Sequence, residues 1–487
     1  MDNAHDLSVL LQARHGLIMA EVEDEARFIE AARTVALDVE RPLWRWSSAR
    51  GLGLDEHPGM YGTNQLSRAL DTVAFIEEAA IFVFQDIHPY LDDPEVIRHI
   101  KEIALRFESE DHTLILTAPK HNVPIELEGL VHVWSIQPAS RKEMARMVRR
   151  TIRHLADTDN LVALSDADFD SVVNALYGTS LRQAEQLLLR AACQGGQLDG
   201  SDIPRMMTAK AQQILSGAVL ELVEADTATL ADIGGMLKLR EWLRLREPAF
   251  RGKAPGLDPP RGLLMTGIPG CGKSLAAKAV AGAWSVPLVL LDPARLYSKY
   301  IGESEERLNQ ALDALDAIAP AVLWIDEIEK GFAFGSGDGG TSKRMLGSFL
   351  RWMQEREAGV FVVATANDVS SLPPELLRKG RFDDIFFVDL PSPAARRDIW
   401  HLQLAKREQI AGRFDIERLV EMTEGNSGAE IEMAVVGALY RAFAVDRDLA
   451  QQDLESELEA TVPLSVTRFE EISHLRRWAQ ERAVSAD

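Results

Sequence analysis

Short apolar runs alternate with longer segments of helical periodicity along both halves of the chain. Apolar runs begin at Leu17, Ile81, Leu263 and Val322, and each is typical of a strand buried on both faces of a parallel sheet. Residues 308–315 place apolar side chains three and four positions apart, which predicts a helix. Strands that alternate with helices in this way indicate an α/β fold with parallel sheets.

The two halves of the chain also repeat one another. Four landmarks recur at offsets of 241 to 247 residues: 17–20 with 263–266, 81–86 with 322–327, 113–117 with 360–364, and 178–185 with 425–432. One such pair would be unremarkable, because buried strands share a composition. Four pairs at nearly constant spacing predict tandem copies of one α/β unit.

Changes in the pattern give the expected domain boundaries. The stretches behind the two α/β units are rich in helical periodicity, whereas the stretch before residue 232 has little apolar periodicity. We therefore expect a first α/β unit over 1–139, its helical lid over 140–215, a linker over 216–231, a second α/β unit over 232–391, and a helical lid with C-terminal helices over 392–487.

A phosphate-binding loop pattern follows the apolar run at Leu263 and precedes a helical run. Glycines let the backbone N–H groups of such a loop turn around phosphates, the lysine supplies positive charge, and the serine offers a hydroxyl group to Mg²⁺. The cofactors expected are therefore ATP and Mg²⁺. The loop comprises Gly267, Ile268, Pro269, Gly270, Cys271, Gly272, Lys273 and Ser274, and Leu275 follows it.

Two adjacent carboxylates, Asp326 and Glu327, end the apolar run that begins at Val322. The carboxyl ends of parallel strands form the usual ligand crevice of open α/β sheets. Asp326 is expected to hold Mg²⁺ with Ser274, and Glu327 to polarise the water that attacks the γ-phosphate. A purely structural role would leave costly buried charges.

With these motifs, the chain resembles the AAA ATPases over residues 229 to 445. The motif Thr365-Ala366-Asn367-Asp368 is similar to the family's sensor element, which implies that Asn367 helps to position the water and the γ-phosphate. The resemblance implies two tandem P-loop NTPase-like (AAA) modules, each a parallel sheet with flanking helices and a helical lid. Runs such as 352–355 and 385–388 resemble those of tandem AAA proteins from bacteria and algal plastid genomes, whose first module is degenerate.

The segment 374–383 is similar to the family's arginine-finger segment. The resemblance implies that Arg378 and Arg381 reach the ATP of a neighbouring subunit and stabilise charge on the transferring phosphoryl group. A ring, of six subunits in this family, is then needed for full activity. The alternative is that both arginines form surface ion pairs.

Two further segments resemble the family's adenine-contacting parts. Asp232, Ile233 and Gly234 are similar to the segment that cradles adenine, and Gly428 with Ala429 corresponds to the lid turn that closes over the nucleotide. Gln403 is expected at the lid position where many relatives carry a histidine near adenine. This substitution puts the adenine contact from that side in question.

The segment 298–305 resembles the first pore loop of substrate-threading members such as katanin, spastin and FtsH. The resemblance implies that Tyr300, flanked by Lys299 and Ile301, presents an aromatic ring to an unfolded protein. A tyrosine packed under the loop is the alternative. The glycine-rich segment 335–340 is expected to form a flexible second pore loop, although a simple connector has the same composition.

The first half is expected to bind no ATP. The repeat places its lost phosphate loop at residues 21–27, which contain four carboxylates but no glycine and no lysine. Asp86 remains at the strand end, and Ile87 stands where a catalytic glutamate is needed. A docking or ring-building platform is the expected role of this half.

The formal net charge of −22 argues against non-specific binding to nucleic acid, although a local basic region would escape that argument. The acidity is equally consistent with a role in solubility alone. No apolar run is long enough to span a bilayer, the first residues lack a secretory pattern, and Cys193 and Cys271 are the two cysteines. We expect a cytoplasmic protein without disulfides and without membrane contact.

These observations lead to one main expectation of function and two alternatives. The main expectation is an ATP-hydrolysing, ring-forming motor that remodels or threads a protein client. The first alternative is an ATP-dependent switch or assembly scaffold without threading. The second is a DNA-associated ATPase, against which the acidity argues.

Overall fold

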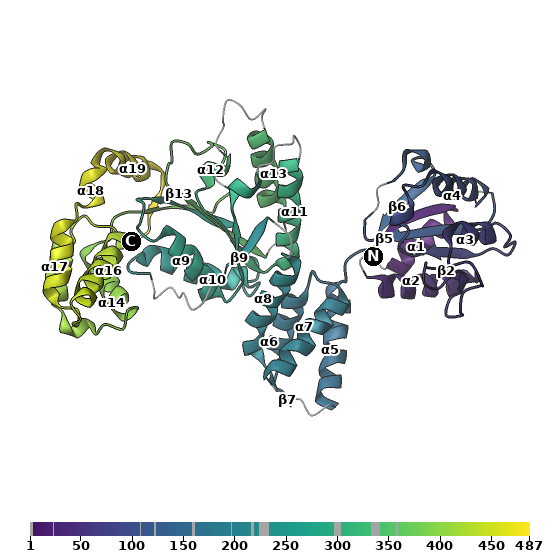
Figure 1. Ribbon diagram of the computed structural model, residues 1–487, viewed down its shortest axis with the longest axis horizontal. Helices are drawn as coiled ribbons and strands as arrows, with labels where there is room; N and C mark the ends of the chain where they lie inside the picture. Colours follow the sequence, from purple (N-terminus) through teal and green to yellow (C-terminus); the bar gives the residue numbers. More distant parts are fainter. Residues whose placement is uncertain are drawn as a thin grey trace. The chain divides into compact units, whose positions relative to one another are not determined.

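The computed structural model describes residues 3–22, 24–107, 109–120, 123–157, 161–195, 197–215, 219–223, 233–296, 303–332, 341–356, 359–378 and 380–487 (Figure 1). The chain divides into two compact units. The first comprises Met1–Ser140 with Ser180–Gln183, and the second comprises Arg141–Thr179 with Ala184–Asp487.

The first unit is a six-stranded sheet with helices on both faces. Its sheet has the order β3-β2-β4-β5-β1-β6 and is parallel except for β3. Helices α1 and α2 cover one face, and α3 and α4 cover the other. The elements are β1 (Leu17–Glu21), β2 (Leu43–Trp46), β3 (Gly53–Leu54), β4 (Ile81–Phe84), β5 (Thr113–Ala118) and β6 (Val131–Ser135), with α1 (Asn3–Gln12), α2 (Glu25–Asp38), α3 (Leu66–Val73) and α4 (Pro94–Phe107).

The second unit contains a seven-stranded sheet of the order β15-β14-β10-β13-β12-β11-β9, parallel except for β9. Helices α9 and α10 contribute to the core on one face, and α11 and α13 to the core on the other. The elements are β9 (Leu220–Val223), α9 (Leu237–Phe250), β10 (Gly262–Gly267), α10 (Lys273–Trp284), β11 (Leu288–Leu291), α11 (Glu303–Ile318), β12 (Ala321–Ile325), α12 (Ile328–Phe332), α13 (Thr341–Glu355), β13 (Val360–Ala366), β14 (Asp384–Val388) and β15 (Val484–Ser485).

The C-terminal helices form a lid with a core of its own. Trp400, Leu419, Ile431 and Leu454 are buried at its centre. The lid lies at one end of the second unit in Figure 1, drawn in yellow-green. Its helices are α14 (Pro393–Ala405), α15 (Ile416–Met422), α16 (Gly428–Ala444) and α17 (Gln451–Ala460). The helices α18 (Leu464–Thr467) and α19 (Phe469–Arg482) follow, and Leu475 and Ala479 of α19 belong to the core of the second sheet.

The five main parallel strands follow the same spatial order in both sheets. In the first sheet this order is β2-β4-β5-β1-β6, and in the second it is β11-β12-β13-β10-β14. The strand that opens each α/β unit therefore lies between the fourth and fifth strands of that unit. Three of the four matched landmarks fall on strands that hold equivalent places in the two sheets, and the fourth falls at two helix starts, Leu181 and Gly428.

The predicted linker over 216–231 is wrong at four residues. Leu220–Val223 form β9, which pairs antiparallel with β11 at the edge of the second sheet. Leu220 is buried in the core of that unit. Four residues are too few to show a periodicity, so the strand is defined by its pairing with β11 and not by its own pattern.

The helices expected to form the lid of the first unit pack instead against the second unit. These helices are α5 (Arg141–Asp157), α6 (Asp166–Leu176), α7 (Leu181–Gly195) and α8 (Ile203–Ile214), with the short strands β7 (Leu161–Val162) and β8 (Gln197–Leu198). Helix α8 contacts α11, and its residues Met207 and Ala211 belong to the two cores of the second sheet. Burial of this apolar surface attaches the helices to the second unit.

A buried lysine lies where these helices meet the second unit. The ammonium group of Lys210 is shielded from solvent and donates hydrogen bonds to the carbonyl oxygen of Tyr177 and, at 3.2 Å, to that of Ala319. Burial lowers the pKa of Lys210 to about 7. Burial of a cation is unfavourable when no carboxylate compensates for its lost hydration.

Replacement of Lys210 by Met is expected to flatten the pH dependence of stability. Between about pH 7 and 10 the unfolded chain keeps the Lys210 proton that the folded chain releases, so the free energy of unfolding rises with pH, by about 2 kcal/mol from pH 7 to 9. Urea unfolding at several pH values measures this slope. Lys253→Met, at an exposed site, should keep the slope, and an unchanged slope in Lys210→Met would contradict the expectation.

Candidate active site

The loop between β10 and α10 adopts backbone angles that favour glycine. Gly267, Gly270 and Gly272 have φ values of 140°, 78° and 93°. A Cβ atom on Gly267 would lie 2.1 Å from the carbonyl oxygen of Val388. The glycines therefore allow the loop to pass close to β14 and to wrap the N-terminus of α10, where backbone N–H groups attract anions.

Lys273 is the first residue of α10 and is buried inside this loop. Its ammonium group donates hydrogen bonds to the carbonyl oxygens of Gly267 at 2.8 Å and Ile268 at 3.0 Å. Burial lowers the pKa of Lys273 to about 8, although nearby carboxylates act in the opposite direction. The loop thus holds the cation at its centre, where phosphate oxygens can replace the two carbonyl groups.

Ser274 and Asp326 meet at the carboxyl ends of the strands. The Oγ of Ser274 lies 3.4 Å from Oδ1 of Asp326, which also accepts a 2.6 Å hydrogen bond from the hydroxyl group of Thr365. A hydroxyl and a carboxylate oxygen suit Mg²⁺, which is commonly held by one or two protein groups and the phosphates of its substrate. Within the described ranges no three acidic, His or Cys side chains form a closed metal site.

Glu327 lies beside this pair in a left-handed backbone conformation, with φ of 50°. Its N–H donates to Thr365 Oγ1 at 3.1 Å, and Asn367 Nδ2 donates to its Oε1 at 2.9 Å. Lys330 donates to the other carboxylate oxygen. The hydrogen bond from Lys330 is the main cause that lowers the pKa of Glu327, followed in the same direction by that from Asn367. The carboxylate is therefore ionised at neutral pH, as a base must be.

Three residues of this network were not among the predicted site residues. Thr365 joins Asp326 to Glu327, and Lys330 pairs with Glu327. Glu329 is buried and accepts the backbone N–H of Asn367 at 2.9 Å, which orients the end of β13. Nothing in the sequence distinguishes Glu329 from a surface carboxylate, because its burial arises only in the folded chain.

The two predicted finger arginines differ in exposure. Arg378 is exposed, and in the described part of the chain its guanidinium group has no hydrogen-bond or ion-pair partner. Arg381 is half-buried and donates to the carbonyl oxygen of Glu375. Arg378 is thus available to another molecule, whereas Arg381 is held by its own segment.

The lid turn and the segment after residue 232 border the opposite end of the loop. Ala429, in the first turn of α16, donates its N–H to the carbonyl oxygen of Gly270 at 3.0 Å. Ile233 is buried, and a Cβ atom on Gly234 would lie 2.6 Å from the side chain of Ile399. Asp232 lies outside the described residues. Within the loop Ile268 is buried, and Leu275, which follows the loop, is exposed.

A small cavity of about 40 Å³ lies at this end, far below the several hundred Å³ of a nucleotide pocket. Its lining includes Ile399 of α14 and does not include Gln403, which lies one helical turn further along, so the expected place of Gln403 near adenine stays a prediction. The side chain of Gln403 accepts a 2.7 Å hydrogen bond from Arg407 instead.

The last residues of the chain also border this cavity. Ala486 accepts the N–H groups of Lys238 and Leu239 at 3.0 and 3.1 Å, and the side chain of Asp487 accepts the N–H of Met236. The tail therefore caps the N-terminus of α9. Burial raises the pKa of the neighbouring Cys271 thiol to about 12, so this sulfur stays protonated.

The predicted pore loop lies outside the described residues. This applies to Lys299, Tyr300 and Ile301, and also to the glycine-rich segment 335–340. The described chain resumes at Glu303, the first residue of α11. The proposed contact of Tyr300 with a protein substrate therefore stays a prediction.

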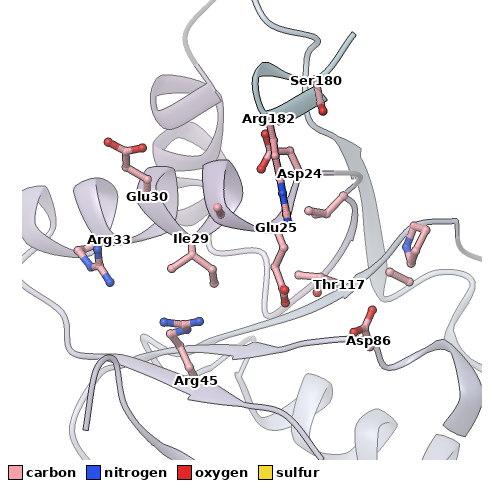
Figure 2. A pocket seen from close by; sticks show the side chains of 14 residues that line it. Asp24, Glu25, Ile29, Glu30, Arg33, Arg45, Asp86, Thr117, Ser180 and Arg182 are labelled. Atoms are coloured by element: carbon pink, nitrogen blue, oxygen red, sulfur yellow. The ribbon is translucent and has the colours of Figure 1, made fainter. Parts of the chain in front are cut away.

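In the first unit, different side chains stand at the corresponding strand ends and helix start. Figure 2 shows Glu25 pointing from α2 toward the strand ends that carry Thr117 and Asp86. Glu25 opens α2 as Lys273 opens α10, so a carboxylate replaces the ammonium group. Gln85 donates to Glu25 and stands one residue after its strand, as Asp326 does.

Asp86 corresponds to Glu327 and not to Asp326. Both residues come second after their strands and have left-handed backbones, with φ of 54° and 50°. The expectation that Ile87 holds the glutamate position was therefore wrong by one residue. The side chain of Asp24 caps α2 by accepting the N–H of Arg27 at 3.2 Å, which places a carboxylate where phosphate would bind.

The sequence comparisons agree with this geometry. The chain is 32% identical over 482 residues to the AAA domain-containing protein ycf46 of Trieres chinensis, with 97% of this chain and 96% of that protein covered. This chain belongs to the AAA ATPase family, among the ycf46-type proteins. Family models match at 263–390 (ATPase family associated with various cellular activities), 3–136 (SpoVK-like AAA ATPase, N-terminal domain) and 142–216 (SpoVK-like AAA ATPase, second domain).

More distant AAA proteins resemble the C-terminal half. The proteasome-activating nucleotidase of Saccharolobus solfataricus is 31% identical over 285 residues, which cover 55% of this chain and 70% of that protein. The Cell division cycle protein 48 homolog of Archaeoglobus fulgidus is 33% identical over 268 residues, which cover 51% and 35%. No helix in the described residues is long and apolar enough to cross a membrane.

Proposed function

We propose that this AAA protein is an ATP-hydrolysing motor that assembles into a ring and remodels a protein client. The observation that carries the proposal is the connected network of the second unit. It links Ser274 of the loop through Asp326 and Thr365 to Glu327 and Asn367. Lys273, the residue before Ser274, is held by carbonyl oxygens of the same loop. This arrangement serves in-line phosphoryl transfer to water.

Each side chain has a defined role in the proposed reaction. Lys273 and the loop N–H groups bind the β- and γ-phosphates, while Ser274 and Asp326 would hold Mg²⁺, which would supply positive charge to the phosphates. Glu327 takes a proton from the attacking water, and Asn367 fixes both the carboxylate and the water. For this step the Glu327 carboxylate must release the hydrogen bond that Lys330 donates to it in the described structure.

Two observations support a ring. Arg378 is exposed and unpartnered in the described chain, as a group acting on a neighbour's ATP must be. Helix α16 exposes Met433, Tyr440 and Phe443 by more than 70% each, at positions that share one face. Exposed apolar patches of this kind mark interfaces, and head-to-tail contacts generate rings when the rotation closes.

The proposal also includes a protein client and an arrangement of two tandem modules. The pore-loop resemblance at Tyr300 and the names of relatives such as the proteasome-activating nucleotidase support a protein substrate. The shared strand order of the two sheets supports two tandem AAA modules. Because carboxylates replace the phosphate-binding groups in the first unit, we propose that it serves as a docking platform.

That first unit also favours a second candidate function. A unit without a nucleotide site suits an assembly scaffold, in which ATP only orders the oligomer. The two functions differ at Tyr300. In a motor, Tyr300→Ala abolishes remodelling of the client while ATP affinity is kept. In a scaffold, Tyr300→Ala leaves function unchanged.

ATP turnover per protomer is expected to rise with protein concentration, together with the mass in solution when ATP is present. Phe443→Glu should prevent this rise while ATP affinity stays normal, because a charge cannot be buried in an apolar contact. Turnover assays and light scattering measure the two quantities. Ile125→Glu, an exposed site in the first unit, is the matched control, and turnover independent of concentration would contradict the ring.

A further inference from the structure

Helix α5 carries a cluster of arginines that the proposed ATPase function does not use. The helix contains six arginine and lysine residues but only two acidic residues, in a chain of net charge −22. All six basic side chains are exposed. The cluster therefore stands out against the charge of the whole molecule.

Four of these residues form one surface, which we call the arginine face: Arg146, Arg149, Arg150 and Arg153. Their spacing of three and four positions places them on the same side of the helix, over about 10 Å of its length. Together with His154 and Asp157 they surround one surface hollow. The four guanidinium groups thus converge on a shared space.

The environment leaves much of this charge available. In the described residues, Arg146 and Arg153 form no ion pair or hydrogen bond. Arg149 stacks over the ring of Phe169, 5.1 Å from its centre, and Arg150 lies 3.5 Å from Glu185. Stacking orients Arg149 without neutralising it. Two carboxylates, Glu185 and Asp157, therefore face four cations.

We propose that the arginine face binds the phosphodiester backbone of nucleic acid. Guanidinium groups match phosphate geometry with two parallel hydrogen bonds, which favours arginine over lysine at such sites. A backbone of regularly spaced phosphates fits a row of cations along a helix. The argument from net charge, which disfavours nucleic acid for the surface as a whole, does not extend to this local face.

Two other polyanionic partners fit less well. The helix exposes no large apolar side chain, whereas the centre of a protein–protein interface needs apolar or aromatic anchors. A membrane-binding helix inserts its apolar face into the bilayer, but Met144, Met147, Val148 and Leu155 of α5 are buried in the protein. A hydrophilic polyanion suits a face that offers charge alone.

The test measures binding of the full chain to labelled oligonucleotides of about 20 nucleotides, single-stranded and duplex, at several salt concentrations. Four phosphate contacts predict a slope of log K against log salt of about −3. Arg146→Gln with Arg153→Gln should lower affinity about tenfold or more at low salt and bring the slope near −1.5. Arg146→Lys with Arg153→Lys should retain most of the binding.

A matched control separates this face from total charge. Arg468→Gln with Arg477→Gln removes two exposed arginines near α19 and should leave binding unchanged. ATP turnover should stay normal in all these variants, so failure here is distinct from failure of the ATPase proposal. The proposal is overturned if the full chain binds neither oligonucleotide, if the α5 variant binds as the control does, or if polyglutamate or anionic vesicles compete better than nucleic acid.

Discussion

Glu327→Gln is expected to lower ATP turnover by about 10²- to 10⁴-fold, the usual contribution of a positioned general base. The amide keeps the shape of the side chain, so the hydrogen bonds from Asn367 and Lys330 to its oxygens can partly persist. It cannot accept a proton from water. ATP affinity should change little, because the phosphates are bound by Lys273 and the loop, and the ring should accumulate in its ATP-bound form.

Single-turnover hydrolysis and equilibrium binding of a fluorescent ATP analogue measure the two quantities separately. Glu306→Gln is the matched control, since it makes the same change on the exposed face of α11. If Glu327→Gln hydrolyses ATP at a normal rate, another group supplies the base and the assignment is wrong. If it fails to bind ATP, the residue has a structural role instead.

Arg378→Ala is expected to lower turnover about 10³-fold or more, as removal of an arginine finger does in related phosphoryl transfers. The free energy of unfolding should not change, because Arg378 is exposed and has no partner in the described structure. Arg381→Ala should reduce stability as well, since Arg381 holds the backbone at Glu375. Turnover and thermal unfolding of the two variants distinguish these roles.

Mixing two inactive variants gives the sharpest form of this test. In a mixture of Glu327→Gln and Arg378→Ala protomers, about a quarter of head-to-tail interfaces combine an intact Glu327 with an intact Arg378 from the neighbour. Activity should therefore reappear on mixing. No recovery in mixtures shown to co-assemble would mean that Arg378 acts within its own subunit or not at all.

The sequence predicted those parts of the site that are built from consecutive residues. The loop 267–274 and the acids Asp326 and Glu327 could be placed because each motif lies within one strand end, loop or helix start. The helix start that lacks a phosphate loop in the first unit could be placed in the same way. At the strand end of the first unit the assignment was wrong by one residue, and the backbone angle of Asp86 confirms that it corresponds to Glu327.

Contacts between distant segments were beyond such reasoning. Thr365 lies 39 positions from Asp326, yet its hydroxyl group donates a hydrogen bond to the Asp326 carboxylate. Glu329 accepts a hydrogen bond from the backbone of Asn367 at the end of a different strand. Ile399 borders the small cavity beside the loop, whereas Gln403, one helical turn away, pairs with Arg407, and only the rotation of α14 decides this difference. Burial and rotation depend on packing between elements.

The sequence by itself determined the α/β pattern, the phosphate loop and the loss of that loop in the first half, because these depend on local periodicity and on residue types at fixed spacing. The tertiary structure alone decided that helices α5 to α8 pack against the second unit, that β9 completes its sheet, and that the tail reaches α9. Those choices rest on complementary buried surfaces, which form only when segments far apart in the chain meet.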